Sequence, residues 1–258
     1  MTRMHWIVRP VLAVLSTASL SLSLSAQAPA GTPGGGQAPP PLKNLQVMSK
    51  DSTRQDVQAM MGAFTQALGV GCNHCHVDDE PDGRPNDMAS DEKRPKTVAR
   101  AMMKLTMDLN GRLPGVVAKE AAATMHVGCA TCHRGVAIPK QITEILSETA
   151  AATGAPAAIE QYKALRKKYY GGQAYDFSEG ALVSFAGRAT QANKADEALT
   201  WLNLNLEFYP NSARTYLGLA NAFNRKGDKA QAITNAEKAV ALDPQNAMAK
   251  RTLDSLKK

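Results

Sequence analysis

The strings Cys72-Asn73-His74-Cys75-His76 and Cys129-Ala130-Thr131-Cys132-His133 contain all four cysteines of this 258-residue chain. Cys-x-x-Cys-His is the spacing at which c-type haem is attached to a polypeptide. The two thiols form thioethers to one porphyrin, and the adjacent histidine binds its iron from the proximal side. We therefore predict two covalently attached haem c groups, held by Cys72 and Cys75 and by Cys129 and Cys132, with His76 and His133 as proximal iron ligands.

Two other interpretations of the cysteines are less consistent with this pattern. A zinc site would repeat the Cys-x-x-Cys pair after roughly 15–20 residues, whereas 53 residues separate Cys75 from Cys129. Structural disulfides occur in exported chains with an even number of cysteines, but they do not explain why each pair ends in Cys-His.

The first 26 residues are predicted to be an export signal peptide. Arg3 and Arg9 make a basic start, and the apolar, serine-rich stretch at 11–24 is too short and too polar to span a bilayer. An uncleaved membrane anchor is the alternative. Covalent haem attachment takes place outside the cytoplasm in bacteria, so the signal peptide and the haem motifs both indicate export. We therefore predict a periplasmic protein.

Composition divides the remaining chain into four parts. Residues 27–43 are rich in proline and glycine and are predicted to form a flexible tether. Residues 44–140 contain both motifs and form the predicted diheme domain, residues 141–178 a connecting helix and linker, and residues 179–258 a helical repeat region. The net charge of +7 is a mild, scattered excess. No nucleic-acid-binding motif is present, so we expect protein redox partners instead.

Two amphipathic helices are predicted in the diheme domain, at about 52–68 and 96–110. Their apolar residues recur at i, i+4, i+7 and i+11, which is one face of a helix. Pro95 suits the start of the second helix, and Gly69 and Gly111 are the predicted stops. The apolar residues are Val57, Met61, Phe64 and Leu68 in the first helix, and Val98, Met102, Leu105 and Leu109 in the second.

The sixth iron ligand decides the functional class. A methionine thioether raises the reduction potential and suits electron transfer, whereas an empty position permits small-molecule chemistry. Because both helices place a methionine at the second apolar position, we predict Met61 for the first haem and Met102 for the second. A methionine on such a face is also common core filler. The alternatives that stay open are Met60, Met103, Met107 and, as a bis-histidine arrangement, His126.

The stretch Ala-Ser-Asp-Glu-Lys-Arg-Pro-Lys-Thr-Val-Ala-Arg-Ala-Met at 89–102, with Asn110 and the Cys-x-x-Cys-His-Arg-Gly string at 129–135, resembles the cytochrome c subunit of photosynthetic reaction centres. In that family an Ala-Arg-x-Met string opens a helix whose methionine is the axial ligand of the following haem, which implies Met102. The string Leu-Gly-Val-Gly-Cys at 68–72 is similar to the family's approach to its first haem, and implies Met61.

The resemblance covers about residues 44–140. The family subunit typically has four haems in two such halves, and this chain contains one half. A photosynthetic role therefore does not follow from the resemblance.

The C-terminal region resembles a tetratricopeptide array. Residues 213–246 match the 34-residue repeat and residues 179–212 fit the same frame, so that Ala186 and Ala198 precede Ala220 and Ala232 by one repeat. Residues 247–258 are predicted to be a capping helix. We predict a protein-docking module, with a stabilising appendage as the alternative.

Together these patterns predict an exported, all-α diheme cytochrome c that transfers single electrons and is not an enzyme. Its donor and acceptor would be proteins, with a membrane electron-transfer complex as a candidate. A peroxidase-like haem oxidoreductase, which needs a vacant sixth position, and a repeat scaffold with structural haems are the alternatives.

Overall fold

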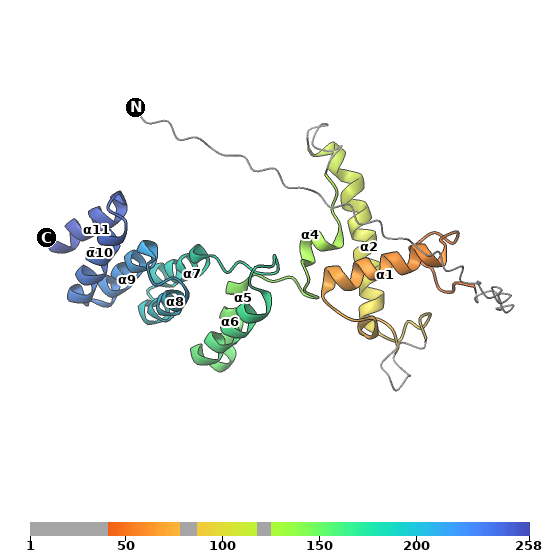
Figure 1. Cartoon of the computed structure of the whole chain (residues 1–258), viewed down its shortest axis with the longest axis horizontal. Helices are drawn as coiled ribbons and strands as arrows, with labels where there is room; N and C mark the ends of the chain where they lie inside the picture. Colours follow the sequence, from red (N-terminus) through yellow and green to blue (C-terminus); the bar gives the residue numbers. More distant parts are fainter. Residues whose placement is uncertain (1–40, 78–86, 118–124) are drawn as a thin grey trace, which may run out of the picture. The chain divides into compact units, whose positions relative to one another are not determined.

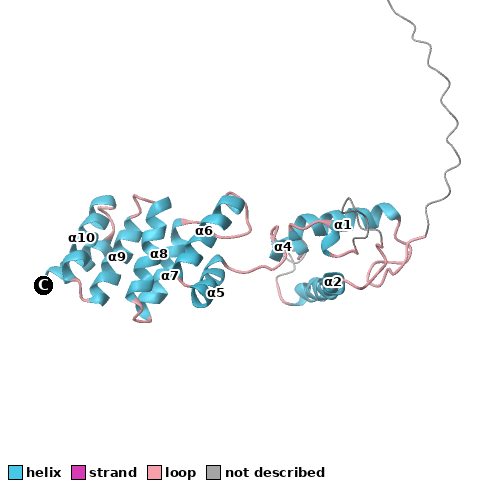
Figure 2. Cartoon of the chain, turned by 90° about the horizontal axis from the view of Figure 1, so that it is seen from below, coloured by secondary structure: helices cyan, strands magenta, loops and turns pink. Residues whose placement is uncertain are grey.

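The structure is a computed structural model and describes residues 41–77, 87–117 and 125–258. Within these ranges the chain forms helices and loops and no β-strand, although one isolated antiparallel bridge pairs Val77 with Asp87. The predicted all-α fold is confirmed, and Figure 2 shows the helices in cyan. The predicted signal peptide and most of the predicted tether lie outside the described residues.

Helix α1 (Arg54–Leu68) has strong signals at both ends. At its start the Asp56 N–H donates to Thr53 Oγ1 at 3.2 Å, and the Thr53 N–H donates to the Asp56 carboxylate at 2.8 Å. These reciprocal bonds form a capping box that satisfies two otherwise unpaired donors. The helix ends at Gly69, which has a left-handed φ of 65°. The predicted stop at Gly69 is therefore confirmed.

Helix α2 (Arg94–Arg112) begins with Pro95 in its first turn, as predicted. The predicted stop at Gly111 is wrong, because Gly111 lies inside the helix. Leu113 caps the helix in a right-handed conformation, and the 3₁₀ turn η2 (Leu113–Gly115) follows directly. Pro114, which lacks a backbone N–H, marks the end of regular α-helix instead.

The two haem motifs occupy short helical turns. The first begins with the 3₁₀ turn η1 (Cys72–His74), and the second is the single turn α4 (Cys129–His133). Helices α1 and α4 pack against each other.

The C-terminal part is an array of helices in which α5 packs on α6, and each helix from α7 to α10 packs on the next (Figure 1). The segment at 141–178, predicted to contain one connecting helix, contains two, α5 and α6. The alanines one repeat apart, at 186 and 220 and at 198 and 232, are all fully buried. The helices are α5 (Ile142–Thr153), α6 (Ala155–Tyr169), α7 (Glu179–Gln191), α8 (Ala195–Phe208), α9 (Ala213–Lys226), α10 (Lys229–Leu242) and α11 (Ala247–Lys257).

Apolar burial is concentrated in this array. Leu146, Leu182 and Trp201 are fully buried in one continuous cluster that spans α5 to α9. Among the described residues before Ile142, only Ala67 and Val136 are buried apolar side chains. The part that contains the haem motifs therefore builds almost no core from its own polypeptide. No helix in the described ranges has the length and apolarity needed to cross a membrane.

Candidate haem-binding site

The first motif folds into a turn that collects its three functional side chains. The backbone N–H groups of Cys75 and His76 both donate to the Cys72 carbonyl, at 3.2 and 3.1 Å. Cys72 is exposed, Cys75 is half-buried and His76 is buried. Burial lowers the pKa of His76, and the positive charge of Lys96 lowers it further. The imidazole is therefore neutral at pH 7, which is the form that binds iron.

His76 also has a nitrogen that the polypeptide does not satisfy. Its Nδ1 is buried and has no hydrogen-bond partner among the described residues. A buried polar atom without a partner costs about 1–3 kcal/mol. The polypeptide alone therefore leaves the His76 ring incompletely satisfied.

The second motif shows the orientation that a metal-binding histidine needs. His133 Nδ1 lies 3.0 Å from the Val136 carbonyl oxygen. Because a carbonyl oxygen only accepts, Nδ1 is the protonated nitrogen, and Nε2 keeps its lone pair for a metal. At the start of the turn the Gly128 N–H donates to Thr131 Oγ1 at 3.0 Å, which fixes the chain just before Cys129.

The rival interpretations of the cysteines gain no support from the structure. All four cysteines are free thiols. The parts of the chain that the structure describes contain no group of three or more histidine, cysteine, aspartate or glutamate side chains arranged to bind a metal ion.

The predicted distal ligands lie on the two long helices. Met61 is half-buried on α1 and Met102 is 40% exposed on α2. Met60, Met107 and His126 are also exposed, and Met103 is half-buried. These positions leave the choice of Met61 and Met102 as a prediction.

The apolar face predicted for α2 is present but is not covered by polypeptide. Val98, Met102, Leu105 and Leu109 have exposed fractions of 47%, 40%, 49% and 42%. We expected this face to be buried, but among the residues that the structure describes no other α-helix packs closely along it. A continuous apolar face beside thiols and imidazoles is what a porphyrin requires, because its ring is a large apolar plate with a metal at the centre. The residues present therefore fit haem c.

Helix α2 contacts the neighbourhoods of both motifs. At its N-terminus Lys93 Nζ donates to the Asn73 carbonyl, inside the first motif, at 2.6 Å. Near its C-terminus Asn110 exchanges two hydrogen bonds with the backbone of Val127, at 2.8 and 2.9 Å, just before the second motif. The helix thus acts as a strut about 25 Å long between these contacts, at 1.5 Å per residue.

The N-terminal end of this strut is held by one carboxylate. Asp91 pairs with Arg100 at 2.8 Å and with Lys96 at 3.2 Å. It also accepts hydrogen bonds from Asn44 and Gln46, at 2.8 and 3.1 Å. Arg100, followed by Asn44, holds the pKa of Asp91 well below its usual range. The sequence did not reveal the bonds to Asn44 and Gln46, because these residues lie 47 and 45 positions away from Asp91 in the chain.

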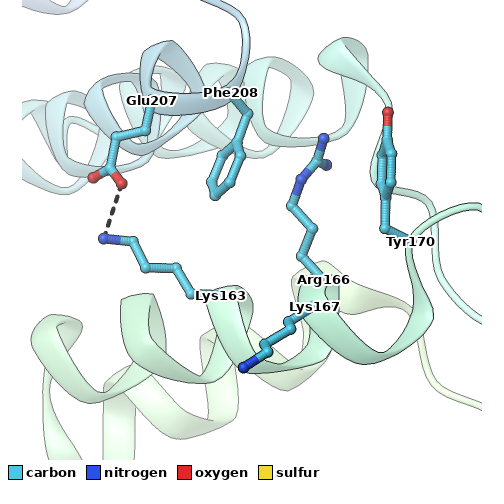
Figure 3. A pocket seen from close by; sticks show the side chains of 6 residues that line it. All are labelled: Lys163, Arg166, Lys167, Tyr170, Glu207 and Phe208. Atoms are coloured by element: carbon cyan, nitrogen blue, oxygen red, sulfur yellow. Dashed lines mark ion pairs between the residues drawn. The ribbon is translucent and has the colours of Figure 1, made fainter.

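A surface hollow of the helical array lies between α6 and α8 (Figure 3). On one side Lys163 Nζ pairs with Glu207 at 2.8 Å. On the other, the Arg166 guanidinium lies 4.0 Å from the centre of the exposed Tyr170 ring and donates to the Phe177 carbonyl at 2.9 Å. These contacts hold α6 to its neighbours. The lining residues are Lys163, Arg166, Lys167, Tyr170, Glu207 and Phe208.

Comparison with known proteins places the haem motifs in a family context. Residues 2–184 match the family model for the photosynthetic reaction centre cytochrome C subunit, a longer region than the 44–140 expected from the sequence. The photosynthetic reaction center cytochrome c subunit of Rubrivivax gelatinosus is 34% identical over 122 residues, which cover 45% of this chain and 30% of the relative. Cytochrome c-554 of Chloroflexus aurantiacus is 37% identical over 90 residues, covering 35% and 20%. The chain thus matches less than a third of the length of either relative.

Proposed function

Because this chain belongs to the photosynthetic reaction centre cytochrome c subunit family, we propose that it is an exported diheme cytochrome c that passes single electrons between protein partners. Family membership itself implies covalent haem c and electron transfer. The observation that supports two haems in this chain is the pair of Cys-x-x-Cys-His turns beside an uncovered apolar helix face. When bound, the haems supply one-electron exchange at iron.

The residues of the chain provide attachment, ligation and a dry environment. Each motif presents two thiols for thioether bonds and one histidine for the iron. Met61 and Met102 are the proposed distal ligands, whose thioethers favour the reduced metal and raise the potential. The apolar faces of α1 and α2 exclude water from the rings, which also favours the less charged, reduced state.

The helical array is proposed to be a pair of tetratricopeptide repeats with a capping helix, acting as a docking module. Its support is the 34-residue spacing of fully buried alanines and the exposed Tyr170 beside three cations in the hollow of Figure 3. Tyrosine and arginine are enriched at protein interfaces. The proposed partners are a donor and an acceptor protein, with a membrane electron-transfer complex as one candidate. Export to the periplasm is proposed from the predicted signal peptide.

Mass spectrometry and near-infrared spectroscopy of exported protein test this function. We expect the polypeptide mass plus two haems, retained under denaturing conditions, and methionine–iron charge-transfer absorption in the oxidised protein. A polypeptide without covalent haem would reject the proposal.

Two substitutions then test the distal ligands. Met61→Ala and Met102→Ala should each remove about half of the charge-transfer absorption and lower one of the two potentials, because each removes one thioether from iron. Met248→Ala, at an exposed position on α11, is the control and should change neither. An unchanged spectrum in Met61→Ala would move the first assignment to Met60, and one in Met102→Ala would move the second to Met103 or Met107.

A further inference from the structure

The end of α1 meets the segment that follows the second haem motif. The Gly135 N–H donates to the Ala67 carbonyl at 2.8 Å. Ala67 and Val136, on the two sides of this bond, are the buried apolar residues of the haem-motif part that the structure describes. A backbone contact thus joins two segments that are distant in sequence.

Gly69 allows this contact in two independent ways. Its φ of +65° is a left-handed conformation that L-residues with a side chain rarely adopt. In addition, a Cβ at position 69 would lie 2.1 Å from the Gly135 carbonyl oxygen and 2.9 Å from the carbonyl carbon. Both are backbone atoms, so no side-chain rotation can relieve the overlap. Any other residue must push the two segments apart.

The two joined segments carry the two haem attachments. Gly69 precedes Cys72 by three residues, and Gly135 follows His133 by two. The contacts at the two ends of α2 add a second connection between the same motifs. The two attachment segments are therefore connected both through α2 and through the junction of Gly69 with Gly135, where the backbones lie too close for a side chain at position 69.

We propose that Gly69 is a positioning residue that sets the separation and mutual orientation of the two haems, and so determines the electronic coupling between them. This inference rests on the proposed diheme function. Because electron-transfer rates fall steeply with separation, a displacement of either attachment segment would slow exchange between the haems. The haem ligands themselves lie elsewhere, so attachment and coupling are separable.

Three glycines provide a matched set of variants. Gly69→Ala introduces both the left-handed strain and the backbone overlap. Gly135→Ala introduces strain alone, because φ is +87° and the space around its Cβ is open. Gly62→Ala, in the middle of α1 with open space around it, introduces neither. Gly69→Asn keeps the overlap but tolerates the left-handed conformation better than alanine.

The readout is circular dichroism of the Soret band in the full-length holoprotein, with haem content measured by mass. Two coupled haems give an exciton couplet whose amplitude depends on their distance and relative orientation. We expect two haems in every variant. The couplet should lose amplitude in Gly69→Ala and Gly69→Asn, change less in Gly135→Ala, and match the wild type in Gly62→Ala.

A wild-type couplet in Gly69→Ala with both haems attached would overturn the inference, as would the absence of a couplet in wild-type protein that contains two haems. Wild-type protein with fewer than two haems would reject the proposed function instead. If Gly69→Ala fails to retain haem, Ala67→Gly decides the question. That variant removes the buried methyl group at the junction and adds no atom, and an unchanged couplet there also overturns the inference.

Discussion

Leu202 of α8 and Gly218 of α9 form a contact that predicts a compensating pair of substitutions. Leu202 is 1% exposed. A Cβ placed at Gly218 would lie 2.7 Å from Leu202 Cδ2 and 3.4 Å from Cδ1. The leucine therefore occupies the space that the missing side chain leaves, and this close approach helps α8 and α9 to pack.

The expected free-energy changes follow from this geometry. Leu202→Ala leaves a cavity and should destabilise the array by about 2–5 kcal/mol. Gly218→Ala should gain about 1 kcal/mol of helix propensity but lose about 1–3 kcal/mol to overpacking against Leu202. In the double variant the overlap is gone, and the new methyl group partly fills the cavity. We expect the double variant to be more stable than the sum of the single changes by about 1–3 kcal/mol.

Urea denaturation followed by far-ultraviolet circular dichroism measures the three unfolding free energies. Gly187→Ala in α7, where a Cβ meets nothing within 4 Å, is the control for helix propensity alone. It should stabilise the array and show no coupling to Leu202→Ala. Single and double changes that add within about 0.5 kcal/mol would refute the packing argument.

Two further predictions concern the haem-motif part. Arg100 and Asn44 lower the pKa of the Asp91 carboxyl in the folded protein. The stability that this carboxylate contributes should therefore be fully present above the unfolded carboxyl pKa of about 4. It should be lost as the pH falls through the lower pKa of the folded state. Asp91→Asn should weaken this acid dependence in thermal denaturation monitored at the Soret band, whereas Asp108→Asn, at an exposed pair with Arg112, should not. Truncation after Lys140 removes the array just before the first buried residue of its core. The shortened protein should keep both haems and both reduction potentials but bind its partner more weakly. Loss of haem on truncation would show that the array belongs to the haem-binding core.

Local sequence patterns predicted the motif turns and several helix ends, because the interactions that form turns and helix caps act over a few residues. A Cys-x-x-Cys-His string closes into one turn wherever it lies, and both motifs do so. Proline in a first turn and a left-handed glycine after a last turn marked the start of α2 and the end of α1. The same reasoning failed at Gly111, because a glycine permits a helix to end without requiring it.

Helix α5 shows a second limit of local reasoning. It lies in the segment at 141–178, for which the sequence predicts one connecting helix and a linker, and the structure places two helices there. Its Ile142 and Leu146 are buried in the core of the array, so tertiary packing stabilises a helix that its own signals did not reveal. The region of the family match, which extends to residue 184, also includes this helix.

The sequence alone determined the helical class and predicted the haem attachment points and the repeat spacing, because each depends on residue type at short separation. Only the tertiary structure placed Asp91 among four partners, connected α2 to both motifs and brought Gly69 against the Gly135 carbonyl. Apart from the ion pairs of Asp91 with Lys96 and Arg100, these contacts join residues 17 or more positions apart in the chain, and no local spacing encodes such an approach. The open apolar face of α2 has the same origin, since periodicity indicates that a face is apolar, and packing alone decides what covers it.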